Sequence, residues 1–291
     1  MTTSINARKN DYGGGAVFAS GPLIVDNSVF TGNLAAYDDS DNEYDGASGG
    51  AIFVYNSTDD VSITNSNFTD NTAGFSGAVM VYDPQYRDEG NILIDSNNFI
   101  KNNVHIAGTI VLQHSAIVTN NNFTENRINT QNINNQPMGA AIVIYDEYLE
   151  KTYKLTLSHN TFKANDAGDV GNGGAILIAP GMILDSNSNV YENNKAVLGG
   201  AIYNLGNATV TDDVFCDNSA VYNGGAIYSG ESLTVNRTRF IDNSVTTGTD
   251  AMINNYGGGA ILASGLLAVD NCVLTGNLAA YDDNGSENDS A

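Results

Sequence analysis

A two-part motif recurs nine times along the 291 residues, and its spacing limits the folds that the chain can adopt. The first half reads Gly-Gly-Ala-Ile or a close variant, and the copies begin at Gly14, Gly49, Ser76, Ala107, Gly139, Gly173, Gly199, Gly224 and Gly258. The second half is an aromatic residue followed three positions later by asparagine, and the pairs are Phe30/Asn33, Phe68/Asn71, Phe99/Asn102, Phe123/Asn126, Phe162/Asn165, Tyr191/Asn194, Phe215/Asn218, Phe240/Asn243 and, with leucine, Leu274/Asn277. In the sixth copy Val190/Asn193 fits almost as well as Tyr191/Asn194.

The spacing of the copies predicts a parallel β-helix. Successive copies lie 25 to 35 residues apart, and the shortest step leaves room for three short strands and three turns. Alternating apolar stretches such as Val61 to Asn65 are typical of strands, and no helical apolar stripe is present. Crossovers between parallel strands are almost always right-handed. We therefore expect an all-β fold, a right-handed parallel β-helix or single-stranded β-solenoid of about nine coils, over residues 1–291.

Each part of the motif has a structural role in such a coil. The paired glycines permit a tight corner, and the alanine and isoleucine fill the interior. The aromatic residues are expected to stack from coil to coil. The asparagine side chains are expected to pair with those of the coils above and below. This structural asparagine ladder would comprise Asn33, Asn71, Asn102, Asn126, Asn165, Asn194, Asn218, Asn243 and Asn277.

A longer repeat lies on top of the short one. Residues 12–39 align without gaps to residues 256–283, and 22 of these 28 positions are identical. The offset of 244 residues continues to both ends, so that residues 1–47 resemble residues 245–291. We therefore expect the chain to be a segment of a longer tandem array with a superperiod of 244 residues. A solenoid end is an open sheet edge that needs a cap, more chain or a partner.

The charge excludes several classes of partner. Eleven basic and 33 acidic residues give a net charge of −22, which argues against binding to nucleic acid or to anionic membranes. No apolar run approaches the roughly 18 residues of a transmembrane segment. The residues that follow Met1 also lack the apolar region of a signal peptide.

Nine alternating copies of Gly-Gly-Ala-Ile and Phe-x-x-Asn resemble the repeat of the chlamydial polymorphic membrane proteins and of adhesin-like surface proteins of other microbes. The resemblance covers nearly the whole chain. It implies a β-helix, an extracellular or cell-surface location (outer membrane-associated if the chain is part of an autotransporter) and a role in adhesion. The chain departs from the family's full pattern because it shows neither the signal peptide nor the C-terminal membrane domain, which leaves export and anchoring open.

An acidic stretch after the first repeat offers oxygen ligands for calcium, the one cofactor for which the sequence provides a candidate site. Its carboxylates belong to Asp38, Asp39, Asp41, Glu43 and Asp45. Their spacing is not that of an EF-hand, and an acidic loop in solvent is the simpler interpretation. The histidines lack the spacing of metal ligands, because each lies in a different coil, at His105, His114 and His159.

The sequence carries less information about N-glycosylation and disulfide formation. Candidate N-glycosylation sequons occur about as often as chance predicts, at Asn56, Asn67, Asn122, Asn207 and Asn236, with two more at Asn284 and Asn288. Cys216 and Cys272 belong to coils seven and nine. Two coils span roughly 9.6 Å, above the limit of about 7 Å between Cα atoms, so we expect no intramolecular disulfide.

Three functions are compatible with these features. The first is a non-catalytic cell-surface rod that binds a protein or glycan of a host or neighbouring cell through its loops. The second is a subunit of an extracellular fibre whose copies stack end to end, with an axial repeat near 38 Å for eight coils at about 4.8 Å each. The third is a polysaccharide lyase or hydrolase. It is disfavoured because Asp212 and Asp213, the adjacent carboxylates within a repeat, would face opposite ways on a strand. We interpret them instead as a corner variant of the Asn-Ser pair found at this position. We expect no enzymatic activity and no catalytic residue.

Overall fold

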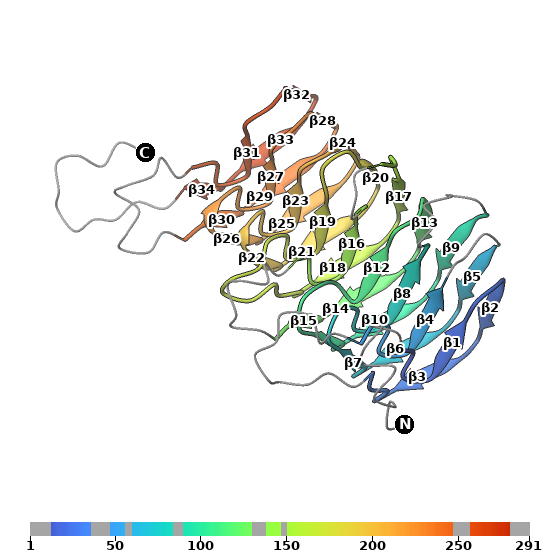
Figure 1. Cartoon of the computed structure of the whole chain (residues 1–291). Helices are drawn as coiled ribbons and strands as arrows, with labels where there is room; N and C mark the ends of the chain where they lie inside the picture. The colour runs from blue at the N-terminus through green and yellow to red at the C-terminus, as the bar shows by residue number, and fades with distance from the viewer. Residues whose placement is uncertain are drawn as a thin grey trace.

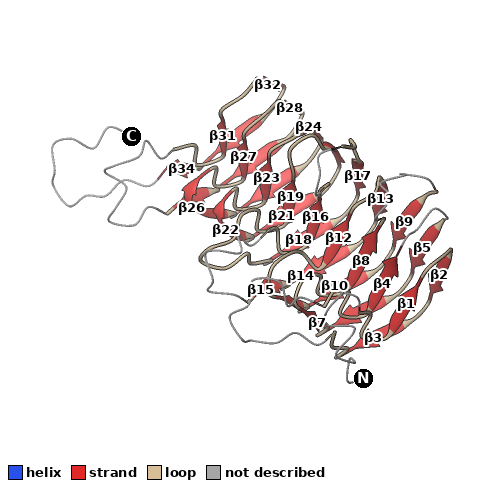
Figure 2. Cartoon of the chain, viewed as in Figure 1, coloured by secondary structure: helices blue, strands red, loops and turns tan. Residues whose placement is uncertain are grey.

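The chain winds into nine stacked coils of β-structure (Figure 1). The computed structural model describes residues 13–35, 47–55, 60–83, 90–129, 138–146, 150–246 and 257–279. These residues contain strands, turns and bends but no helix (Figure 2). Each coil runs through three main strands, and each strand pairs in parallel with its equivalent in the next coil. The prediction of an all-β parallel β-helix of about nine coils is therefore confirmed.

Three nine-stranded sheets form the long faces of the rod. Sheet A contains β1 Val17–Ala19, β4 Ile52–Tyr55, β8 Val79–Tyr82, β12 Ile110–Leu112, β16 Ile142–Ile144, β19 Ile176–Ile178, β23 Ile202–Asn204, β27 Ile227–Ser229 and β31 Ile261–Ala263. Sheet B contains β2 Leu23–Asp26, β5 Val61–Thr64, β9 Ile92–Asp95, β13 Ala116–Thr119, β17 Lys154–Ser158, β20 Ile183–Asn187, β24 Asn207–Thr211, β28 Leu233–Asn236 and β32 Leu267–Asp270. Sheet C contains β3 Val29–Thr31, β6 Asn67–Thr69, β10 Asn98–Ile100, β14 Asn122–Thr124, β18 Thr161–Lys163, β21 Val190–Glu192, β25 Val214–Cys216, β29 Arg239–Ile241 and β33 Val273–Thr275.

A fourth, interrupted face closes the coils between sheets C and A. One patch contains β7 Thr72–Ala73, β11 Asn103–Val104 and β15 Arg127–Ile128. The other patch contains β22 Lys195–Leu198, β26 Ser219–Asn223, β30 Ser244–Val245 and β34 Leu278–Ala279. Isolated bridges from Asp166 to Arg127 and to Lys195 connect the two patches.

The aromatic residues of the motif form a continuous stack in the core. Neighbouring rings lie 4.5 to 4.9 Å apart between centroids, with interplanar angles of 3° to 10°. This spacing matches the separation of adjacent strands, about 4.8 Å, so rings in equivalent positions stack without displacement. In coil six the stacked ring is Tyr191, between Phe162 and Phe215, and Val190 lies beside it on the same strand.

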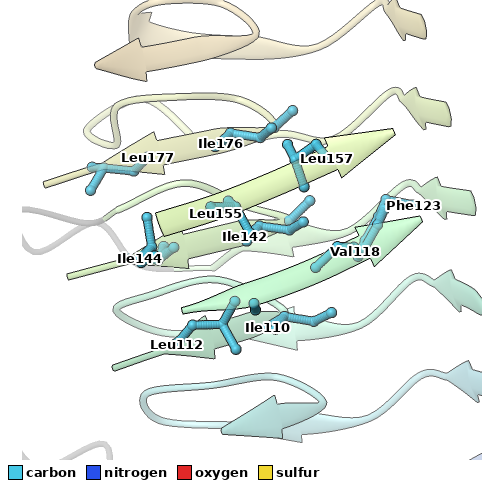
Figure 3. Packing of buried hydrophobic residues seen from close by; sticks show 14 of the residues in the cluster. Ile110, Leu112, Val118, Phe123, Ile142, Ile144, Leu155, Leu157, Ile176 and Leu177 are labelled. Atoms are coloured by element: carbon cyan, nitrogen blue, oxygen red, sulfur yellow. The ribbon is translucent and has the colours of Figure 1, made fainter. Parts of the chain in front are cut away.

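Aliphatic side chains fill the rest of the interior in columns (Figure 3). Ile110, Ile142 and Ile176 are register partners in sheet A, and Val118 and Leu157 are partners in sheet B. All five are fully buried. Each coil therefore supplies the same few core positions, which explains why one short motif suffices for the whole rod.

The second glycine of the motif permits close approach between coils. A Cβ atom at Gly200 would lie 2.1 Å from the carbonyl oxygen of Gly225, and one at Gly174 would lie 2.1 Å from that of Gly200. The first glycine also permits a backbone conformation that other residues rarely adopt, because Gly173 and Gly199 have φ values of +73° and +60°. A Cβ atom at Gly173 would in addition lie 2.2 Å from the carbonyl oxygen of Ile176, so the first glycine is required both for backbone conformation and for backbone contact.

Sheet A differs from the alternating pattern, because both of its faces are covered in coils two to six. Strand alternation directs Phe53, Met80 and Val111 away from the core, yet they are at most 3% exposed. Their register partners in coils seven and eight, Tyr203 and Tyr228, are half-buried. Strands buried on both faces are apolar throughout, which explains runs such as Ile142–Ile144.

We predict that replacing one ring of the aromatic stack destabilises the rod strongly. Phe123→Ala removes a fully buried ring that contacts two others, and should cost about 3–5 kcal/mol. Phe123→Leu should cost less, since coil nine carries Leu274 in this column. The measurement is urea unfolding followed by circular dichroism. Ile117→Ala, at a 51% exposed position, is the control and should change stability by at most about 0.5 kcal/mol. Equal effects of Phe123→Ala and the control would contradict the role of the stack.

Candidate functional site

All nine asparagines of the motif are brought together in one ladder along the corner after sheet C. In each step the backbone N–H and the side-chain Nδ2 donate to the Oδ1 of the asparagine in the next coil. For Asn102 these distances to Asn126 are both 3.0 Å. The Nδ2 of Asn102 also donates to the carbonyl oxygen of Phe68 in the preceding coil, at 2.9 Å. The steps run without a gap from Asn33 to Asn277.

A second polar ladder, which the sequence analysis did not identify, lies at the corner between sheets B and C. Its members accept a hydrogen bond from the backbone N–H of their equivalent in the preceding coil, and they are Ser66, Asn97, Asn121, Asn160, Asn189, Asp213 and Thr238. All are buried. Each stands two residues before the ring of the aromatic stack, a regular spacing that could have revealed the ladder.

Asp213 is the charged member of the second ladder and is closed to solvent. Its Oδ1 accepts from the backbone N–H of Asn189 at 2.7 Å, and its Oδ2 accepts from the hydroxyl of Ser186, which also pairs with the Tyr191 hydroxyl. Burial raises the pKa of Asp213 to about 7, although the hydrogen bonds from Asn189 and Ser186 oppose the shift. A carboxyl group therefore occupies a position that asparagine fills in four coils.

Asp212, the neighbour of Asp213, faces outward. It adopts a φ of +55° at the corner and receives two hydrogen bonds from the guanidinium of Arg237, at 2.8 and 2.7 Å. These hydrogen bonds lower the pKa of Asp212. The two adjacent carboxylates thus point to opposite sides of the coil wall, and only Asp212 is accessible to a ligand.

Two tyrosines form an aromatic pair on the outer face of sheet A. The rings of Tyr203 and Tyr228 stack with their centroids 5.1 Å apart and an interplanar angle of 22°. Both are half-buried, and burial, followed by the nearby Tyr228, raises the pKa of Tyr203. A second half-buried pair on the outer face of sheet A is formed by Tyr55 and Tyr82 of coils two and three, whose ring centroids lie 5.9 Å apart.

The sequon asparagines have different surroundings. Asn67 and Asn122 are exposed on sheet C and are joined through Asn98, whose Nδ2 donates to Asn67 at 2.8 Å and whose Oδ1 accepts from Asn122 at 2.9 Å. Asn207 is exposed at the start of β24, whereas Asn236 is half-buried at the end of β28. Asn56, Asn284 and Asn288 lie outside the described residues.

The calcium candidates also lie outside the described part of the chain, namely Asp38, Asp39, Asp41, Glu43 and Asp45. Among the residues that the structure does describe, no group of three or more His, Cys, Asp or Glu side chains is placed to hold a metal ion. His159 occupies the positive-φ corner that Asn65 and Asn120 hold in other coils. Cys216 and Cys272 are free thiols in coils seven and nine.

The longer insertions leave the coils at only two places. The segments 56–60, 83–91 and 145–153 connect sheet A to sheet B, and the segments 36–51, 129–141 and 246–260 precede a strand of sheet A. In coil four the first of these connections needs only three residues, Gln113 to Ser115. The flanking strands stack in register, so each set of insertions starts from one corner of the rod.

Comparison with known families agrees with this architecture. Residues 34–180, which make up half of the chain, match the family model for the right-handed β-helix region, and the chain belongs to this family. Residues 214–230 match the Chlamydia polymorphic membrane protein repeat. This match spans Phe215, Asn218 and the Gly-Gly-Ala-Ile that begins at Gly224, so it covers both halves of the motif. Neither a curated protein nor a solved structure shows significant similarity to the chain.

No helix in the described ranges is long and apolar enough to cross a membrane.

We predict that removing one asparagine from the first ladder destabilises the fold. Asn126→Ala leaves the buried N–H of Asn102 without its acceptor and the Oδ1 of Asn165 without its side-chain donor. The expected loss is about 2–4 kcal/mol, measured by urea unfolding. Asn122→Ala, four residues earlier on the exposed face, is the matched control and should cost less than about 1 kcal/mol. If Asn126→Ala unfolded at the same urea concentration as the wild type, the ladder would not hold the coils together.

We also predict a pH dependence that originates from Asp213. Its pKa rises from 3.8 to about 7 on folding, so the folded state holds this proton more tightly. The protonated carboxyl group of Asp213 therefore stabilises the folded state fully below pH 3.8. This stabilisation, at most about 4 kcal/mol, is lost as the pH rises through about 7. Asp213→Asn should therefore be more stable than the wild type at pH 8, and the difference should shrink towards pH 4.

The measurement is thermal unfolding of both chains between pH 4 and pH 8. Asp212→Asn, which changes the exposed neighbour, provides the control and should alter the slope between pH 5 and pH 8 only slightly, because the charge of Asp212 is the smallest contribution to the raised pKa of Asp213. A wild-type slope that Asp213→Asn does not change would mean that Asp213 remains ionised in the folded chain.

Proposed function

We propose that the protein is a non-catalytic, adhesin-like β-helix protein of the cell surface or extracellular space. The observation that supports this proposal best is the match of residues 214–230 to the Chlamydia polymorphic membrane protein repeat, within a chain that carries nine copies of the motif. The proposed partners are proteins or glycans on the surface of a host or neighbouring cell. Neither nucleic acid nor an anionic membrane suits a net charge of −22.

The architecture is suited to presenting a binding surface. Three nine-stranded parallel sheets around a continuous core make a stiff support. Loops on a rigid scaffold can vary without cost to the core, and the insertions of this chain differ in length from coil to coil. We therefore assign binding to the two corners from which the insertions start, with the Tyr203–Tyr228 pair as a further contact.

The surroundings of the carboxylates support a function without catalysis. An inverting glycosidase needs two carboxyl groups about 6.5–9.5 Å apart on one cleft. Asp213 is buried in the coil wall, and Asp212 is engaged by Arg237. A polysaccharide lyase or hydrolase is thus the weaker candidate. Incubation with acidic polysaccharides, with and without Ca²⁺, should release no product, and clear turnover would overturn the non-catalytic assignment.

Two further expectations belong to this proposal. The chain is interpreted as one β-helix that forms a segment of a longer tandem array, because of the 244-residue superperiod. Calcium remains the one cofactor proposed, for the acidic stretch that contains Asp38 and Asp41. Calorimetric titration with Ca²⁺ should show saturable heat in the wild type that Asp41→Asn reduces, whereas no heat in the wild type would exclude the calcium site.

We predict that labelled chain binds saturably to at least one surface in a panel of animal cells, microbial cells and immobilised glycans. Shortening one insertion should weaken this binding at least tenfold. One such variant replaces residues 83–91 with the connection Gln-His-Ser that coil four uses between the same sheets, and residues 56–60 and 145–153 can be replaced likewise. Retained β-sheet circular dichroism would show that the shortened rods still fold.

The control for this experiment is Thr209→Ala, an exposed side chain on sheet B that is remote in sequence from the insertions. It should bind as the wild type does. Absence of saturable binding to every surface tested, or wild-type binding by all shortened variants, would contradict an adhesin-like role that uses these insertions.

A further inference from the structure

Three columns of the rod interior each contain one residue that departs from the repeat, and the three departures meet at one place. In sheet B, Ser186 lies between Leu157 and Val210, in a column whose other members are leucine, isoleucine or valine. Tyr191 lies in a stack of otherwise phenylalanine rings, and Asp213 lies in a ladder of otherwise neutral polar residues. Because Ser186 and Tyr191 belong to coil six and Asp213 to coil seven, the departures face each other across one interface between coils.

The hydroxyl group of Ser186 connects the three residues. It donates to the Oδ2 of Asp213, lies 2.9 Å from the hydroxyl oxygen of Tyr191 and accepts from the Nδ2 of Asn189 at 3.0 Å. A serine hydroxyl has one hydrogen to donate and two lone pairs that accept. Donation to Asp213 and acceptance from Tyr191 and Asn189 therefore use its full capacity. All four side chains are at most 1% exposed, so water does not replace any of these partners.

Asparagine, the commonest residue of the second ladder, does not satisfy this arrangement. Asp213 accepts at both carboxylate oxygens, from the backbone N–H of Asn189 and from Ser186. An asparagine in its place accepts at one oxygen and directs a second donor at Ser186. The Ser186 hydrogen must then go to Tyr191, whose own hydrogen is left without an acceptor. Coil six would therefore bury an unsatisfied hydroxyl group against any coil that carries asparagine at this position.

A second polar contact joins coil seven to coil eight. In the inward column of sheet A that continues Ile144 and Ile178, coil seven has Asn204 and coil eight has Ser229. The Nδ2 of Asn204 donates to the Oγ of Ser229 at 2.9 Å, and its Oδ1 accepts from the backbone N–H of Gly206 at 3.1 Å. Both side chains are fully buried. Coil seven thus makes a particular polar contact with each of its two neighbours.

The rest of the interior does not distinguish one coil from another. The same stack, the same asparagine ladder and the same aliphatic columns run through successive coils, so the core accepts many pairings equally well. Misassembly and exchange of elements between copies are characteristic failures of such repeat chains. A buried polar group whose partner exists in one arrangement alone disfavours the others, and fixing a register is the best-attested use of such groups.

We propose that the buried polar contacts of coil seven fix the order in which coils six, seven and eight stack. These five pairing residues are Ser186, Tyr191, Asp213, Asn204 and Ser229. They exclude other coil pairings during folding, because each wrong neighbour leaves a buried hydroxyl, amide or carboxyl group without its partner. Their role is selection of one arrangement and not additional stability, since apolar replacement of a whole buried polar cluster is often neutral or stabilising.

The first test compares urea unfolding of three chains at pH 8. Ser186→Val alone removes the donor to Asp213 and the acceptor for Tyr191, and should lower the midpoint by roughly 0.5 to 1 M. The triple variant Ser186→Val, Tyr191→Phe and Asp213→Asn carries the residues of neighbouring coils, namely Val210, Phe215 and Asn189. Its midpoint should be at least that of the wild type. A triple variant no more stable than Ser186→Val would overturn the coupling between the three residues.

The second test measures which coils pair on refolding. Val190 and Val214 are register partners on the outer side of sheet C, across the interface between coils six and seven. Adjacent strands lie about 4.8 Å apart, within the range for a disulfide bond. Val190→Cys and Val214→Cys, in a chain with Cys216→Ser and Cys272→Ser, therefore report correct pairing as a disulfide within one chain. The chain is diluted from urea under oxidising conditions, and the disulfide within the chain is quantified by mass spectrometry.

The chain that keeps the pairing residues should form this disulfide at least twice as completely as the chain with the triple replacement. Ser66→Asn, which places the common ladder residue in coil two, is the matched control and should not change the yield. Equal yields with and without the pairing residues would overturn the proposal, and the urea midpoints show independently that each chain folds. Adhesion is not needed for either result, so this proposal and the proposed function stand or fall separately.

Discussion

The rod depends on the identity between two distances, the separation of adjacent parallel strands and the stacking distance of planar side chains. Parallel strands lie about 4.8 Å apart, and the aromatic rings of successive coils lie 4.5 to 4.9 Å apart. Asparagine amides in equivalent positions form hydrogen bonds of 2.8 to 3.0 Å across the same step. One backbone spacing therefore satisfies the sheets, the aromatic stack and the asparagine ladder simultaneously.

The corners show how this arrangement offsets strain. Each coil places a residue with positive φ immediately before the ladder residue, such as Lys101 before Asn102 and Glu125 before Asn126. Non-glycine residues adopt this conformation at a cost of roughly 1–2 kcal/mol. The ladder residue that follows satisfies the backbone N–H group of its equivalent in the preceding coil, and two such bonds per step offset the cost. A corner is stable here because its neighbours are stacked against it.

Much of the fold could be read from the sequence because the repeat makes every coil an independent observation of the same positions. The strands, the aromatic stack and the first asparagine ladder all follow from Phe-x-x-Asn and its spacing. The second ladder was harder to see, since Ser66, Asn97, Asp213 and Thr238 share a position without sharing a residue type. The covered outer face of sheet A was missed for a related reason, because an apolar residue in mid-strand does not reveal what lies over it.

The sequence by itself determined the coil, its length and the number of repeats, because these depend on periodicities that are local to one coil. Only the tertiary structure decided which way each corner residue faces. It placed Asp213 inside the wall and Asp212 in solvent, and selected Tyr191 over Val190 for the stack. Burial of this kind is set by coils that are distant in sequence and adjacent in space, so no local pattern contains it.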